Sequence, residues 1–203
     1  MELIGERWSL MVLRELMLGP RRFSDLRSSL PGISAKVLTE RLAGLEAIGA
    51  LRRERLPPPA AVQVYALTRW GLAAEPALQE LGRWAAMHSG HDPLLPLSPV
   101  SFMLSMRTMF RADRSEGVAT RIGFVVREEA FIAEVADRKL AVVRGAAENA
   151  EAVLRAPDAT LLAALLYADV PLPELEAAGL TIEGDRALAL RYATLFSLPE
   201  KLA

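Results

Sequence analysis

The chain has 203 residues, of which 52% are apolar and 24% are charged, and its formal net charge is −1. This composition is typical of a globular protein with one large or two small domains, and it excludes an intrinsically disordered chain. Because the chain has no cysteine, disulfide bonds, thiol nucleophiles and thiolate metal sites are excluded, and we expect the protein in a reducing cytoplasm. No apolar run is long enough to span a membrane, so we expect no membrane partner.

Three short helices are expected in the first part of the chain. Leucines at helical spacing indicate a first helix that ends at Gly19-Pro20. A second helix is expected between Ser24, whose hydroxyl can cap free backbone N–H groups, and the turn at Pro31-Gly32. A third helix, capped by Ser34, is expected to run until Gly49 closes it, with its leucines directed inward.

Two extended segments and a fourth helix follow. The segments LRRERL and VQVYALT, separated by PPPAA, alternate in polarity and predict an antiparallel hairpin. Thr68 can cap a helix that runs through Trp84. Residues 88–98 then combine prolines, a glycine and serines without any helical or strand period, so we expect a linker there between domains at 1–87 and 99–203.

The second domain is expected to mix helices and strands. The segment SPVSFMLSMRTMF has phenylalanines and methionines at helical spacing and predicts an amphipathic helix. The runs ATRIGFVV, AFIAEVAD and RKLAVVRG predict strands, with a hairpin turn at Asp137-Arg138. Helical periodicity returns in ATLLAALLYA, PELEAAG and DRALALRYATLF, and LTIEG predicts a strand between the last two.

Three short helices followed by a hairpin form the order of a winged helix-turn-helix domain. In such a domain the third helix enters the major groove of DNA and the hairpin reaches the adjacent backbone. Lys36 can donate to guanine or to a phosphate, and Thr39 can bond a base or pack on a thymine methyl group. Glu40 can accept from a cytosine amine or pair with an arginine, while Ser34 lies where the helix N–H groups would meet a phosphate.

Arginines near the second helix and on the hairpin are candidate phosphate contacts. A single arginine on a strand edge is more often solvated than bound, but these arginines share one predicted face, which favours the set. The predicted phosphate contacts are Arg21, Arg22, Arg52, Arg53 and Arg55.

The segment from Ile4 to Glu54, with VYALTRWG after it, closely resembles the HxlR-type winged-helix transcription regulators. The resemblance covers residues 3–86 and includes Trp8, the GPRRFSDL segment, the LPGIS turn, the LTERL helix and the YALT step. It implies a sequence-specific regulator that binds double-stranded operator DNA as a homodimer. Members of that family often sense oxidants or electrophiles through a cysteine. This chain has none, so a signal must enter in another way or not at all.

Apolar residues at the two ends of the first domain exceed the needs of one small core. We therefore expect the two-fold interface of a homodimer around Ile4, Trp8, Leu81 and Trp84. The alternative is that both tryptophans pack within the monomer, or that Trp84 packs against the second domain.

Residues 98–203 are similar to sterol carrier protein type-2 domains, most clearly in LTIEGDRALALRYATLF and DATLLAALLYA. The resemblance implies helices on a curved sheet and an apolar tunnel that binds a hydrophobic small molecule. Methionines and aromatic residues suit such a pocket, although at helical spacing they more often form plain core. The candidate lining residues are Phe102, Met103, Met106, Phe110, Phe124, Phe131, Leu165 and Phe196.

No constellation of residues predicts catalysis, so we expect no enzyme and no cofactor. His88, His91 and Asp92 could at most form an incomplete metal site, and we expect them in a solvated linker. The sequence thus predicts an α+β protein with a winged helix-turn-helix domain before a sterol-carrier-like domain. We expect a cytoplasmic, homodimeric transcription regulator modulated by a hydrophobic small molecule. The alternative is a lipid carrier that uses the winged helix as a protein-interaction module.

Overall fold

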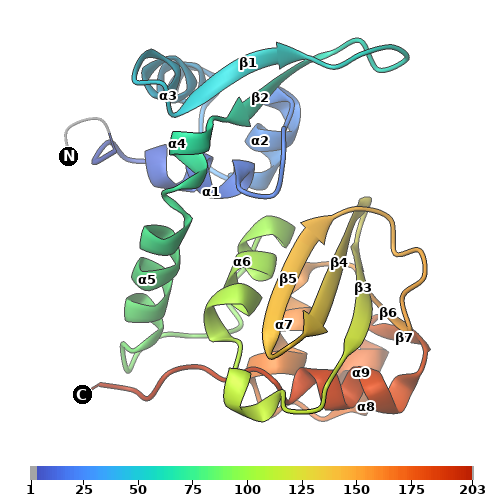
Figure 1. Cartoon of the computed structure of the whole chain (residues 1–203). Helices are drawn as coiled ribbons and strands as arrows, with labels where there is room; N and C mark the ends of the chain where they lie inside the picture. The colour runs from blue at the N-terminus through green and yellow to red at the C-terminus, as the bar shows by residue number, and fades with distance from the viewer. Residues whose placement is uncertain (1–3, 203) are drawn as a thin grey trace. The chain divides into compact units, whose positions relative to one another are not determined.

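The computed structural model describes residues 4–202 and divides the chain into two compact units. The first unit ends at Leu78 and the second begins at Gln79. Figure 1 labels the helices and strands of both units. Helices and strands occur in both units, so the α+β class predicted from the sequence is confirmed. Within the described residues, no helix is long and apolar enough to cross a membrane.

The first unit combines three short helices with a two-stranded hairpin, in the predicted order. Its elements are α1 (Ser9–Leu16), α2 (Phe23–Ser29), α3 (Ala35–Ala47), β1 (Leu51–Arg55), β2 (Gln63–Leu67), α4 (Arg69–Leu72) and the start of α5 (Glu75–Ala86). Leu13 on α1, Leu26 on α2 and Leu38 on α3 are each at most 1% exposed. One core therefore holds the three helices together. β1 and β2 pair antiparallel, as the hairpin prediction requires.

The start of α2 differs from the prediction. The helix begins at Phe23, and the Asp25 carboxylate accepts the Arg22 backbone N–H at 3.3 Å. Ser24 lies inside the helix and donates its hydroxyl to Asp25 at 3.1 Å. The prediction that Ser24 caps α2 is therefore wrong. Asp25, at the third helical position, caps the helix instead, because its carboxylate can reach back to a free N–H group.

The single helix expected from Thr68 through Trp84 is two helices. Thr68 caps α4 as predicted, since its hydroxyl accepts from the Gly71 N–H at 3.1 Å. The chain then leaves the helix and starts α5, in which Pro76 is the second residue. A proline has no N–H to donate and its ring clashes with the carbonyl group four residues earlier, so α4 cannot continue through this position.

The second unit is built on one mixed sheet. Its elements after α5 are α6 (Pro99–Met109), η1 (Ala112–Arg114), β3 (Thr120–Val126), β4 (Glu129–Ala136), β5 (Lys139–Arg144), β6 (Ala152–Ala156), α7 (Ala159–Tyr167), α8 (Leu172–Ala177), β7 (Thr181–Gly184) and α9 (Arg186–Ala193). The strand order is β5-β4-β3-β6-β7, and the β3 to β6 pairing is parallel. The predicted helices, strands and Asp137-Arg138 turn are present. β6 was not predicted from the sequence.

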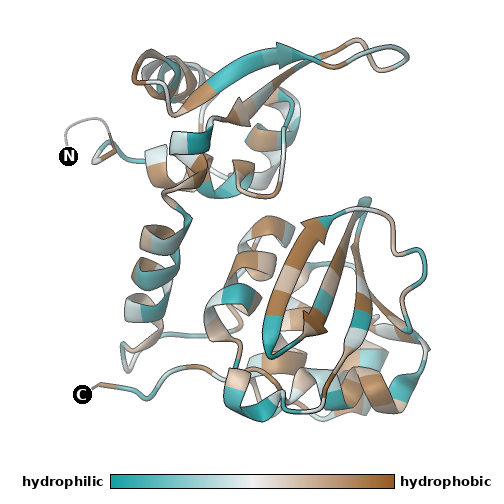
Figure 2. Ribbon diagram, in the orientation of Figure 1, coloured by the Kyte–Doolittle hydropathy of each residue, from teal (hydrophilic) through white to brown (hydrophobic). Residues whose placement is uncertain are grey.

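Aromatic rings fill the space between the sheet and the helices on one of its faces. Phe124 on β3 has its ring centre 6.1 Å from that of Phe102 on α6 and 6.0 Å from that of Tyr192 on α9. Phe196, just after α9, lies 5.0 Å from Tyr192 by the same measure. These side chains are at most 3% exposed, so α6 and α9 cover the same face of the sheet. Hydrophobic residues recur along α6 and the strands (Figure 2).

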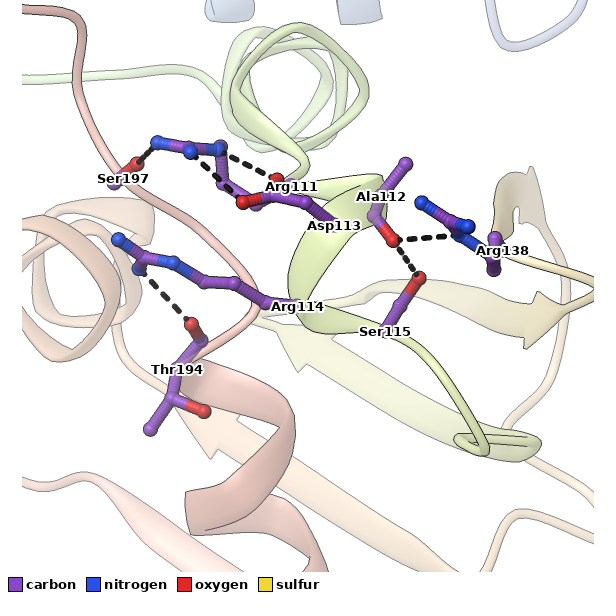
Figure 3. A network of polar contacts seen from close by, with 8 residues as sticks. All are labelled: Arg111, Ala112, Asp113, Arg114, Ser115, Arg138, Thr194 and Ser197. Atoms are coloured by element: carbon purple, nitrogen blue, oxygen red, sulfur yellow. Dashed lines mark hydrogen bonds and ion pairs between the residues drawn. The ribbon is translucent and has the colours of Figure 1, made fainter.

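A polar network fastens the short η1 helix to the rest of the second unit (Figure 3). Arg111 binds the Asp113 carboxylate through two hydrogen bonds of 3.0 Å and donates to the Ser197 hydroxyl at 3.1 Å. The hydrogen bond from Arg111 lowers the pKa of Asp113. Arg114 and Arg138 donate to backbone carbonyl groups of Thr194 and Ala112. The network joins η1 to the C-terminal segment and to the β4–β5 turn.

The boundary between the units falls inside α5, before the linker predicted at residues 88–98. Two side chains bind the later part of α5 to the second unit. Arg83 donates to the Thr108 carbonyl at 2.6 Å. Lys201 donates to the carbonyl groups of Ala86 and His88, at 3.0 and 3.3 Å. A cation at the C-terminus of a helix also interacts favourably with the negative end of the helix dipole. The last turns of α5 therefore belong to the second unit.

Candidate nucleic-acid interface

α3 has one buried face and one exposed face, as the sequence predicts. Leu38, Leu42 and Leu45 are at most 1% exposed and fix the helix to the core of the first unit. Lys36 and Glu40, on the opposite side of the helix, are exposed. Because the residues of an α-helix are 100° apart, packing three leucines inward leaves these two side chains free to meet an outside partner.

Ser34 caps α3, and this predicted role is confirmed. Its hydroxyl oxygen accepts the Val37 N–H at 3.2 Å, while its backbone is extended. The cap ends the Pro31-Gly32 turn and starts the helix at a defined residue. The positive end of the helix dipole is exposed beside it, and such an end attracts phosphate.

We expect Ser34→Ala to reduce the stability of the first unit by about 1 kcal/mol, because the Val37 N–H loses its partner. Ser24→Ala is the matched control, since the Ser24 hydroxyl lies inside α2 and caps nothing. Urea unfolding followed by circular dichroism measures both variants. Equal losses in the two variants would show that the cap is not what stabilises α3.

The contacts of Thr39 and Glu40 within the chain limit the hydrogen bonds that each side chain can form with a base. The Thr39 hydroxyl donates to the Ala35 carbonyl at 2.9 Å, so its proton is engaged and its oxygen is left as an acceptor for a base amine. The Glu40 carboxylate lies 3.9 Å from the Arg41 guanidinium, a long contact with an exposed carboxylate that contributes little. Glu40 can therefore exchange Arg41 for a base amine at small cost.

The hairpin formed by β1 and β2 carries arginines on one face. Arg53 and Arg55 alternate with Arg52 along β1, and Gln63 lies directly opposite Arg55. Arg53 is bound to Glu46 on α3 at 2.9 Å, and Arg55 donates to the Ala61 carbonyl at 3.2 Å. An open hollow on the surface of the hairpin is lined by Arg53, Glu54, Arg55, Ala61 and Gln63. The exposed Gln63 was missed from the sequence, although the register of the hairpin could have identified it.

Arg52 lies on the other face of β1 and is bound to Glu54 at 3.1 Å. The strand alternation places it away from Arg53 and Arg55. The sequence prediction placed all five arginines on one face of the domain, and within β1 the strand alternation separates Arg52 from Arg53 and Arg55.

Arg21 does not occupy the position expected of a phosphate contact. Its residue is 6% exposed, and its guanidinium donates to the Ser29 hydroxyl at 3.1 Å. Its backbone also exchanges two hydrogen bonds with Tyr65, at 3.0 and 2.8 Å, and so adds a short third edge to the hairpin. This pairing turns the side chain inward. Arg22, in contrast, is exposed at the start of α2.

The expected dimer residues are exposed to different degrees. Trp84 is 71% exposed and Leu81 is 48% exposed, and both lie on α5 in the second unit. Ile4 and Trp8, in the first unit, are half-buried. Trp84 is therefore not packed within the second unit, which was one alternative for it.

The residues predicted to line a ligand tunnel are mostly packed core. Phe102, Met103, Met106, Phe124 and Phe131 are fully buried and Phe196 is 3% exposed, whereas Phe110 and Leu165 are half-buried. The rings touch one another, as described above, which agrees with the plain-core alternative. The Tyr192 hydroxyl among them has the Met106 sulfur, at 3.9 Å, as its hydrogen-bond partner. Burial raises the pKa of Tyr192 and of the nearby Tyr167.

Within the described residues, no group of three or more histidine, aspartate or glutamate side chains could hold a metal ion. His88 and His91 lie beside the C-terminal segment. Burial, and then the charge of Lys201, lowers the pKa of His91.

The first part of the chain is similar to known proteins. Residues 3–93 match the model of a family described as HxlR-like helix-turn-helix. The chain is 39% identical over 83 residues to the HTH-type transcriptional regulator YodB of Bacillus subtilis, covering 41% of this chain and 74% of YodB. It is 36% identical over 84 residues to YvaP, an uncharacterized HTH-type transcriptional regulator of the same organism, covering 41% and 78%. The solved structure of reduced YodB aligns with 45% of this chain and 90% of its own, at 36% identity and a TM-score of 0.41. The sterol-carrier resemblance of residues 98–203 stays a prediction.

Proposed function

The chain belongs to the HxlR-like helix-turn-helix family, and from this premise we propose that it is a cytoplasmic, homodimeric transcription regulator that binds a specific operator. The observation that carries the proposal is α3, which is capped by Ser34, anchored by leucines on one side and exposed on the other. In this function α3 enters the major groove, and the β1–β2 hairpin lies along the adjacent backbone.

Lys36, Thr39 and Glu40 are the proposed base contacts. Lys36 donates to guanine, and the Thr39 oxygen and the Glu40 carboxylate accept from adenine or cytosine amines. Ser34, at the start of α3, is the proposed phosphate contact of the helix N-terminus.

Arg22, Arg53 and Arg55 are the proposed phosphate contacts. Arg53 must exchange Glu46 for a phosphate. An exposed ion pair contributes roughly 0.2–1 kcal/mol, and a charge-assisted hydrogen bond to phosphate is stronger, so the exchange favours DNA. Arg52 would reach a phosphate only if the other face of the hairpin also meets the duplex. Arg21 is left out of the interface because it is buried.

We expect Lys36→Ala to change which sequences are bound and Arg53→Ala to weaken all sequences alike. A lost base contact costs about 1–3 kcal/mol at one base pair. A lost phosphate contact lowers the slope of log affinity against log salt by about 1. Selection of duplexes from a random pool, followed by salt titration, measures both effects. Arg69→Ala on α4 is the control and should change neither. An equal loss on all sequences for Lys36→Ala would make Lys36 a phosphate contact.

The homodimer is proposed to form through α5. Leu81, Trp84 and Ala85 are exposed and lie on one face of this helix, because residues three and four apart are neighbours. An exposed tryptophan beside an exposed leucine is an unusual surface for a monomer and suits a self-complementary two-fold contact. A dimer would bind two half-sites about 34 Å apart. Ile4 and Trp8 stay in the proposal only as flanking residues.

We propose that an apolar small molecule bound in the second unit regulates DNA binding by the first unit. The chain has no cysteine through which an oxidant could act. The Phe102, Phe124 and Tyr192 rings pack against one another, so a ligand must separate them to enter. The weak contact of the Tyr192 hydroxyl with Met106 is the easiest to replace. Tight binding of acyl chains without salt-dependent affinity for DNA would instead favour the lipid-carrier alternative.

A further inference from the structure

The segment before α1 contacts α3 and its entry turn at two points. Glu6 forms an ion pair with Arg41, which lies on the flank of α3 and is 20% exposed in its side chain. Trp8 lies over the Pro31-Gly32 turn, and a Cβ placed on Gly32 would be 3.8 Å from the Trp8 Cη2 atom. The two contacts therefore bear on the turn that leads into α3 and on a point nearly two turns along the helix.

The backbone of this segment is strained. Trp8 has φ of 79°, a left-handed conformation that bulky residues rarely adopt. Such strain persists only where the surrounding contacts enforce it, and it is often found at functional positions. The Trp8 carbonyl accepts the Val12 N–H at 2.8 Å, and the Glu6 carbonyl accepts the Ser9 N–H at 3.0 Å. The strained residue is thus fixed to α1 on one side and to the entry turn of α3 on the other.

Gly32 gives the turn beside Trp8 its backbone conformation. Its φ is 91°, so an L-residue is disfavoured there whatever space is available. A Cβ at position 32 would be at ordinary van der Waals distance from the Trp8 ring, so the ring borders the turn and leaves room for a methyl group there. A movement of Trp8 would therefore move the residues that lead directly into Ser34.

We propose that Trp8 and Glu6 form a brace that sets the rotation of α3 about its axis, and so act as positioning residues for sequence recognition. This inference rests on the proposed function. Adjacent α-helical residues are 100° apart, so a modest rotation of α3 would turn Lys36 and Thr39 away from the base edges. The arginines proposed to contact phosphates, Arg22, Arg53 and Arg55, lie outside the brace, so the charge-based attraction to DNA and its salt slope do not depend on the brace.

The test is Trp8→Phe, with Trp70→Phe as the matched control. The shorter ring keeps an apolar residue before α1 but cannot reach Gly32. Trp70, on α4, is 57% exposed. Its replacement by phenylalanine is the same chemical change at a surface position of the same unit. The probe is a duplex selected by the wild-type protein from a random pool, compared with a scrambled duplex of equal composition.

We expect Trp8→Phe to bind the selected duplex about tenfold more weakly, while its affinity for the scrambled duplex and its salt slope stay unchanged. Trp70→Phe should bind both duplexes like the wild type. Glu6→Gln and Arg41→Gln should each lose part of the preference, and the double variant should lose no more than either one. Equal losses on both duplexes, or no loss for Trp8→Phe, would overturn the brace.

Hydrogen exchange separates this inference from the proposed function. In Trp8→Phe, but not in Trp70→Phe, amides from Gly32 to Arg41 should exchange faster, with or without DNA. If the wild-type protein selects no sequence but this exchange difference is found, the proposed function fails and the brace stands. If the protein selects a sequence but exchange and preference are unchanged in Trp8→Phe, the brace fails alone.

Discussion

We expect Trp84→Lys to convert the proposed homodimer to a monomer and to weaken binding to a two-half-site operator by about 100-fold or more. Trp84 is 71% exposed, so its replacement removes no core packing and should leave the fold intact. A central interface tryptophan contributes roughly 2–4 kcal/mol, and a two-fold interface contains it twice. A monomer then binds one half-site at a time and loses the gain from simultaneous binding.

Sedimentation velocity measures the oligomeric state, and a duplex with one or two half-sites separates dimerisation from contact with DNA. The monomeric variant should bind the single half-site as the wild-type unit does. Trp70→Lys is the control, because it places the same charge at another exposed tryptophan. If Trp84→Lys stays dimeric, the interface lies elsewhere. If Trp70→Lys is the variant that becomes monomeric, the dimer interface lies on α4.

Phe124→Ala will destabilise the second unit by about 3–5 kcal/mol, the usual cost of removing a buried aromatic ring from a packed core. The ring is fully buried and contacts both Phe102 and Tyr192. Because a domain of this size is stable by only about 5–15 kcal/mol, the second unit should then unfold at much lower urea concentration. The first unit has its own core and should be unaffected.

Urea unfolding by circular dichroism, with hydrogen exchange to assign each transition to a unit, measures this change. Val143→Ala on β5 is the control, since Val143 is 55% exposed and its truncation should cost below about 1 kcal/mol. A loss for Phe124→Ala as small as that of the control would mean that the ring is not tightly packed, as expected of a residue lining a ligand tunnel. The same experiment therefore separates core from tunnel.

Periodicity identified most helices and strands, and it failed where a distant residue decides the structure. β6 is the clearest case. Its segment AVLRA is short, and it becomes a strand because Ile122 to Val126 on β3 pair with it in parallel. Parallel partners are joined by long connections, so the local sequence contains no turn that announces them. The order of the strands in the sheet was unpredictable for the same reason.

Some features of the candidate site were also predictable from the sequence, and others depend on contacts between distant residues. The exposed face of α3 follows from helical spacing alone, and Ser34 was identified as its cap from sequence. The burial of Arg21 follows from its backbone pairing with Tyr65. The distribution of the hairpin arginines between two faces follows from the register of β1 and β2.

The sequence by itself determined the winged helix-turn-helix order, the helix that would meet DNA and the family, because these depend on residues close together in the chain. Only the tertiary structure decided that Trp8 lies against Gly32, that the last turns of α5 belong to the second unit, and that the aromatic residues of that unit fill its core. Those features depend on contacts between distant residues, and no local pattern encodes which distant side chain will fill a given space.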